Sequence, residues 1–106
     1  MDKAVIELIG QLMASNATLQ QQAEAGEWDA FLDETAAYAM GMRTLCDIDL
    51  TQLAQHIKPR VTAQLAQLLE NDVQLTRAMQ CRLTEIGTEL SAMRKSCASA
   101  KAYTAV

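Results

Sequence analysis

Residues 24–39 read EAGEWDAFLDETAAYA, and this stretch decides the fold. Gly26 follows a run of helix-forming residues and predicts a helix end, because glycine readily takes the left-handed conformation found there. Glu27 and Asp29 come next and favour the positive N-terminus of a second helix. A connection of only a residue or two between helices predicts an antiparallel pair. The stretch therefore indicates a helical hairpin.

The composition of the whole chain agrees with a helical fold. The 106 residues include one Pro and four Gly, so few positions break a helix. Half of the residues are hydrophobic, and only 4% are aromatic. Ala, Leu, Gln, Met and Glu dominate, and these are strong helix formers. We predict one all-α domain with a single modest core.

Apolar spacing predicts an antiparallel helical bundle of three main helices, at residues 3–24, 27–46 and 59–91, plus a short C-terminal helical segment. We expect residues 1–91 to form the bundle domain and residues 92–106 to form a mobile helical tail. This tail either extends the long helix or forms a short fourth helix, with Ser91 and Ser96 as plausible breaks. In the first helix, Asn16 interrupts the apolar stripe, and we expect it at the edge of that stripe.

The third helix carries more apolar positions than one core needs. Its main seam includes Asp72 where an apolar residue is expected, and Leu69 and Val73 start a second stripe beside it. A helix with two apolar stripes can serve its own core with one and bind a partner with the other. The seam residues are Val61, Leu65, Leu68, Leu75, Met79, Leu83, Ile86 and Leu90.

Three of the four aromatic residues lie close together after Gly26. Trp28, Phe31 and Tyr38 fall on or near one helix face. No second type of ligand residue lies nearby to suggest a cofactor pocket. We therefore interpret Gly26, Trp28, Phe31 and Tyr38 as a structural corner, with Trp28 fixing the hairpin.

The charge distribution argues against nucleic-acid binding. The net charge is −4, divided into −7 for residues 1–56 and +3 for residues 57–106. Phosphate contacts need clustered Lys and Arg, which this acidic chain lacks. The division fits charge complementarity between helices, or a basic C-terminal surface for an acidic partner.

The sequence lacks the residue motifs that catalysis or metal binding needs. His56, the only His, falls in the predicted linker, and we expect it to be solvated. The three Cys, at 46, 81 and 97, match no metal-site spacing and indicate reduced thiols in the cytoplasm. No run of apolar residues is long enough to cross a membrane. We predict no enzyme activity, no catalytic or metal residues and no cofactor.

Two segments resemble a known family. AEAGEWDAFLDETAAYAMGM, at 23–42, is similar to the corner between the first two helices of the FliT family of flagellar export chaperones. Residues 68–103 resemble the family's long third helix and the start of its final segment. The shared features are G-E-W-D at 26–29, Tyr38, Asn71 with Asp72, the Q-x-R-L-x-E-I run at 80–86, Lys95-Ser96 and Ala102-Tyr103.

The resemblance implies a cytoplasmic chaperone. Its members bind the C-terminal region of the flagellar filament-cap protein, keep it soluble and deliver it to the type III export apparatus. They also contact the export gate and the export ATPase complex. In enteric members they bind the flagellar master transcription regulator and repress its output.

Two sites follow from the resemblance. The family's cap-binding surface falls near Leu65 and Leu69 here. With the neighbouring stripe positions, the predicted client-binding groove comprises Leu65, Leu68, Leu69, Asp72 and Val73. Tyr103 matches the family's C-terminal Tyr, which is implicated in docking to the export gate. The alternative is a structural or regulatory helical bundle that acts mainly as a homodimer.

Overall fold

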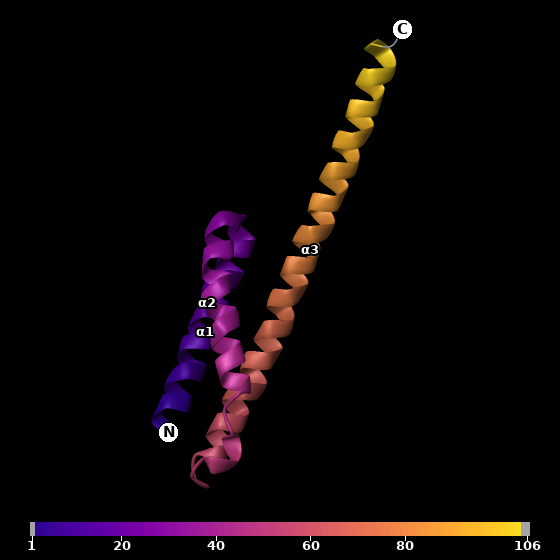
Figure 1. The fold of residues 1–106 in the computed structure, drawn as a ribbon. Coiled ribbons are helices and arrows are strands. Elements are labelled where there is room, and N and C mark those ends of the chain that lie inside the picture. The colour runs from indigo at the N-terminus through magenta and orange to yellow at the C-terminus, as the bar shows by residue number, and fades with distance from the viewer. Residues whose placement is uncertain (1, 105–106) are drawn as a thin grey trace. The chain divides into compact units, whose positions relative to one another are not determined.

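The computed structural model describes residues 2–104 of the chain, and the side chains of residues 2–101. The described residues are all-helical, with no strand among them. In chain order the elements are α1 (Asp2–Ala25), α2 (Trp28–Cys46), the short 3-10 helix η1 (Leu50–Gln52) and α3 (Lys58–Thr104) (Figure 1). The predicted all-α class is confirmed.

The turn between α1 and α2 depends on Gly26. Its φ of 73° lies in the left-handed region, where a side chain is strained. The N–H of Gly26 bonds the carbonyl of Ala23 at 3.2 Å, and the N–H of Glu27 bonds the carbonyl of Gln22 at 2.8 Å. These two bonds form a Schellman motif, which satisfies carbonyls that the end of α1 leaves open.

The linker between α2 and α3 is partly ordered by Asp49. Its carboxylate accepts hydrogen bonds from the Thr51 N–H at 3.0 Å and the Thr51 hydroxyl at 2.6 Å. These bonds favour the charged carboxylate and lower the pKa of Asp49. Asp2 reaches the same linker, because its Oδ2 accepts the N–H of Ala54 at 3.4 Å.

α3 is longer than the predicted third helix. It begins at Lys58, with Pro59 in the first turn where the missing N–H costs nothing. It continues through Ser91 and Ser96 without a break and ends at Thr104. The C-terminal segment thus extends α3, which is one of the two arrangements that the sequence allows.

The chain divides into two compact units, residues 1–76 and residues 77–106. The core lies in the first unit, where α1, α2 and the first part of α3 contribute buried side chains. The buried apolar residues are Val5, Ile9, Leu12, Leu19, Phe31, Tyr38, Leu45, Leu53, Val61, Leu68 and Leu75. Among the described side chains of the second unit, none is buried.

One core residue corrects the sequence prediction. Asn16 is not at the edge of its stripe, because 0% of its surface is exposed. A buried amide needs hydrogen-bond partners, and periodicity alone does not reveal them. Those partners come from α2 and from α1 itself, as described below.

Candidate functional site

The predicted groove residues of α3 fall on different sides of the helix. Leu68 has 0% of its surface exposed and belongs to the core. Leu69, the next residue, is 57% exposed, and Val73, one turn later, is 50% exposed. Residues four apart lie on the same face of a helix. Leu69 and Val73 therefore form an exposed apolar pair, and Leu68 does not join them.

Asp72 belongs to a polar network in the core of the first unit. The Tyr38 hydroxyl donates to Oδ1 of Asp72 at 2.8 Å. The same hydroxyl accepts a hydrogen bond from Nδ2 of Asn16 at 3.1 Å. The network thus joins α1, α2 and α3, and it accounts for the acidic residue in the apolar seam of α3.

Gln20 completes the network. Its Nε2 donates to Oδ1 of Asn16 at 2.7 Å and to the backbone carbonyl of Asn71 at 3.3 Å. Both ends of the buried Asn16 amide are therefore satisfied. A buried polar network of this kind specifies one arrangement of the helices that carry it, because any other pairing leaves polar groups without partners.

Burial raises the pKa of Tyr38 to about 12. The hydrogen bond from Asn16 favours the phenolate and opposes this rise, whereas the hydrogen bond to Asp72 and its negative charge add to it. Tyr38 therefore keeps its proton to a higher pH than an ordinary tyrosine does. The protonated hydroxyl can then donate to Asp72 while it accepts from Asn16.

Leu65 lies on a different part of the surface, beside the linker. It is half-buried and helps to line an open pocket of about 240 Å³. The sequence prediction missed this pocket, because three of its seven lining residues come from the linker between α2 and α3, where apolar periodicity gives no signal. Its other lining residues are Leu50, Thr51, Leu53, Lys58, Val61 and Thr62.

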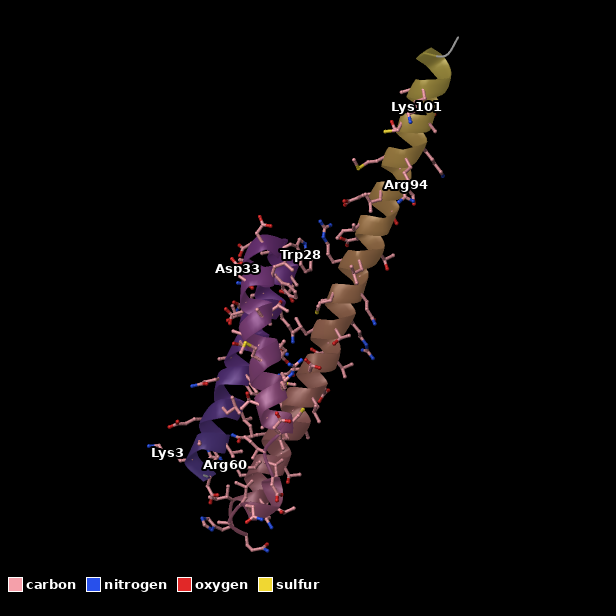
Figure 2. The ribbon with its side chains drawn as sticks, viewed as in Figure 1. Lys3, Trp28, Asp33, Arg60, Arg94 and Lys101 are labelled. Atoms are coloured by element: carbon pink, nitrogen blue, oxygen red, sulfur yellow. The ribbon has the colours of Figure 1, made fainter. Side chains whose placement is uncertain are left out.

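The aromatic residues after Gly26 pack into the first unit. Phe31 is buried, and Trp28 is half-buried against the core cluster. The two rings meet edge to face, with centroids 5.1 Å apart and an interplanar angle of 63°. Figure 2 labels Trp28 at the N-terminal end of α2. These positions leave Trp28 and Phe31 with a packing role.

Tyr103 and His56 are the remaining residues that the sequence analysis singled out. Tyr103 lies in the last turn of α3, and its side chain is outside the described residues. His56 is exposed in the linker.

The described part of the chain holds no group of three or more His, Cys, Asp or Glu residues placed to hold a metal ion. Within residues 2–104, no helix is both long and apolar enough to span a membrane.

Two large apolar residues of α2, Leu32 and Met40, are exposed. Phe31, Tyr38 and Leu45, which recur every seven residues, are the buried ones. This seven-residue spacing in the sequence is the signal that separates Leu32 from the buried face.

Comparison with protein-family models identifies the chain. The model described as "Flagellar protein FliT" matches residues 3–105, nearly the whole length. Comparisons with curated proteins and with solved structures give no match. The family match includes the hairpin, the linker and all of α3. The chain therefore belongs to the FliT family of flagellar export chaperones.

Proposed function

We propose that this protein binds the C-terminal region of the flagellar filament-cap protein in the cytosol and delivers it to the export apparatus. The observation that carries the proposal is the exposure of Leu69 and Val73 on a well-formed helix whose neighbouring Leu68 is in the core. Family membership supports a flagellar protein as the client. The exposed pair gives the client an apolar surface to cover.

The scaffold for this surface is an antiparallel three-helix bundle. Three contacts support the arrangement. A Cβ on Gly41 would meet Leu12, Asn16 bonds Tyr38, and Ser15 bonds Glu34 at 2.9 Å. Leu12 thus meets a later residue of α2 than Ser15 and Asn16 do, which is the order that an antiparallel pair gives. The Tyr38–Asp72 bond fixes α3 beside this pair and sets which residues of α3 stay outside.

The binding mechanism is burial of an amphipathic client helix. Full burial of an exposed Leu or Val supplies roughly 1.5–3 kcal/mol, and because Leu69 and Val73 are about half exposed, covering them supplies about half of that for each side chain, before the cost of ordering the client. Asp72 is held by Tyr38 inside the bundle, so we assign it to the scaffold and not to client contact.

A substitution at Leu69 tests this proposal. Leu69→Asp places a charge on the exposed pair and is expected to abolish co-purification with the C-terminal piece of the cap protein. Gln74→Asp is the matched control, because Gln74 is also exposed on α3 but lies on a different side of it. Circular dichroism should show both variants fully helical. Unchanged client binding by Leu69→Asp would place the groove elsewhere.

Docking to the export apparatus is a separate part of the proposal. We assign contact with the export gate to Tyr103, on the resemblance of Ala102-Tyr103 to the family's C-terminal motif. Tyr103→Ala should keep client binding and lose gate binding. A fall in melting temperature with gate binding preserved would instead make Tyr103 a residue that fastens the tail. Contacts with the ATPase complex and with the flagellar transcription regulator belong to the same proposal.

The homodimer alternative makes a different prediction. If the Leu69 surface serves self-association, sedimentation of the isolated protein will show a dimer that Leu69→Asp dissociates. A monomer that binds the cap-protein piece supports the chaperone role. These outcomes separate the two functions with the same variant.

A further inference from the structure

The part of α3 in the second unit carries an apolar stripe of its own. Large apolar residues recur there at alternating steps of four and three, which is the spacing of a coiled-coil seam. Leu83 is 67% exposed and Met93 is 62% exposed. We name Met79, Leu83, Ile86, Leu90 and Met93 the distal stripe.

The distal stripe repeats the core-facing pattern of the same helix. Moving eighteen positions along the chain, which is about five turns of α-helix, maps one set onto the other. Val61, Leu68 and Leu75, which belong to the first set, are buried in the core. The matched pairs are Val61 with Met79, Leu65 with Leu83, Leu68 with Ile86, Asp72 with Leu90, and Leu75 with Met93.

This repeat indicates what kind of surface the stripe fits. The first set packs against helices, so an apolar set with the same spacing also suits a helix. Leu90 stands where the first set has Asp72, which makes the distal stripe wholly apolar. It therefore needs no polar network like that of Tyr38.

The charges of the second unit indicate the sign of the charge that a partner should carry. Residues 77–101 hold five basic and two acidic residues, a net charge of +3. The two acids are already engaged, because Arg82 lies 3.3 Å from Glu85 and 3.5 Å from Glu89. Arg94 directly follows Met93 of the stripe and has no ion-pair partner among the described residues.

Basic residues also flank the seam. In heptad positions, Arg82, Arg94 and Lys101 lie at the e and g sites beside the apolar residues, with Glu89 the one acid there. Figure 2 labels Arg94 and Lys101 on this part of α3. Three of the four charges at these sites are positive, and charges at these sites favour a partner of opposite sign.

We propose that the distal stripe is a docking surface for an acidic amphipathic α-helix of another protein. The partner helix places apolar residues on the stripe and a carboxylate opposite Arg94. This surface is separate in the sequence from the Leu69–Val73 pair. The proposal does not depend on the identity of the client that binds the first unit.

Two synthetic peptides test the proposal on the full chain. Both have Leu at the heptad a and d positions, and one has Glu at every e and g position where the other has Lys. The Glu peptide is expected to bind about tenfold or more tightly than the Lys peptide, measured by fluorescence anisotropy. Its affinity should fall as salt is raised, since salt screens exposed charges.

Variants assign the binding to the stripe. Leu83→Gln combined with Leu90→Gln should abolish binding of the Glu peptide. Thr84→Gln combined with Ser91→Gln is the matched control, because these exposed residues follow the stripe residues by one position and lie off its face. The control pair should bind as the parent chain does. Arg94→Glu should reduce the preference for the Glu peptide.

Three results would overturn the proposal. The first is equal or absent binding of the two peptides. The second is a dimer of the free chain that Leu83→Gln with Leu90→Gln dissociates, because a second copy would then cover the stripe. The third is a lower free energy of unfolding for that double variant in urea, because the stripe would then be packed within its own chain.

Discussion

The Tyr38 hydroxyl lies 2.8 Å from Oδ1 of Asp72, 34 residues further along the chain. Through this bond α2 holds α3, and through the bond from Asn16 at 3.1 Å it holds α1. One phenol therefore links all three helices of the first unit. Because it fixes which side of α3 faces inward, it also determines that Leu68 is buried and Leu69 is exposed.

Removal of this hydroxyl should destabilise the fold. Tyr38→Phe leaves the Asn16 amide without its acceptor and Asp72 without its donor, at an expected cost of roughly 1–3 kcal/mol. Urea unfolding followed by circular dichroism measures the change. The control is Thr18→Val, which removes an exposed hydroxyl bonded only within α1. Equal stability of the two variants would mean that the network contributes nothing.

The raised pKa of Tyr38 predicts a loss of stability at alkaline pH. Its pKa lies at about 12 in the folded chain and near the ordinary 10.0 when unfolded. The folded state therefore holds the proton more tightly, so this contribution is complete below pH 10 and is lost as the pH rises toward 12. The stability advantage of the parent chain over Tyr38→Phe should shrink across that range. A constant difference would contradict the assignment.

The corner between α1 and α2 should depend on glycine. Gly26→Ala puts a side chain at φ 73°, which is expected to cost about 1–2 kcal/mol. Gly10→Ala is the control, since a Cβ there meets nothing within 4 Å and Ala favours helix by about 1 kcal/mol over Gly. Thermal unfolding should lower the midpoint of the first variant and raise that of the second. A stable Gly26→Ala would rule out a strained corner.

The close packing of α1 against α2 should make the fold sensitive to substitution of Gly41. A Cβ built there lies 2.6 Å from Cδ2 of Leu12, so Leu12 must move to admit even a methyl group. Gly41→Val is expected to cost about 1–3 kcal/mol by overpacking. Gly87→Val, in open space on α3, should leave the unfolding free energy unchanged or slightly higher. The same response at both sites would show that the contact is not tight.

The sequence predicted where the helices lie better than it predicted which face of each helix is buried. Gly26 and Pro59 are strong local signals, and they placed the starts of α2 and α3 within one residue. The end of the third helix was missed, because Ser91 and Ser96 were read as breaks although Ala, Met, Arg and Lys around them sustain a helix. Local signals therefore mark where helices begin more reliably than where they continue.

The candidate site was only partly predictable, for a physical reason. Leu68 and Leu69 are the same residue type at adjacent positions, and only packing against the hairpin separates them. That packing is set by Asn16 and Tyr38, which are far from both in sequence. Asp72 seemed out of place in an apolar seam until its partner Tyr38 was known. Side-chain pairing between helices thus decides what periodicity leaves open.

The central claim is that this FliT-family protein binds a client helix on the exposed face of α3. Titration calorimetry of the full chain with the C-terminal segment of the filament-cap protein tests it most directly. We predict saturable binding with a negative heat-capacity change, the signature of apolar burial. Val73→Asp should remove the binding heat, and Gln74→Asp should keep it. Absence of binding by the parent chain, or full binding by Val73→Asp, would contradict the account.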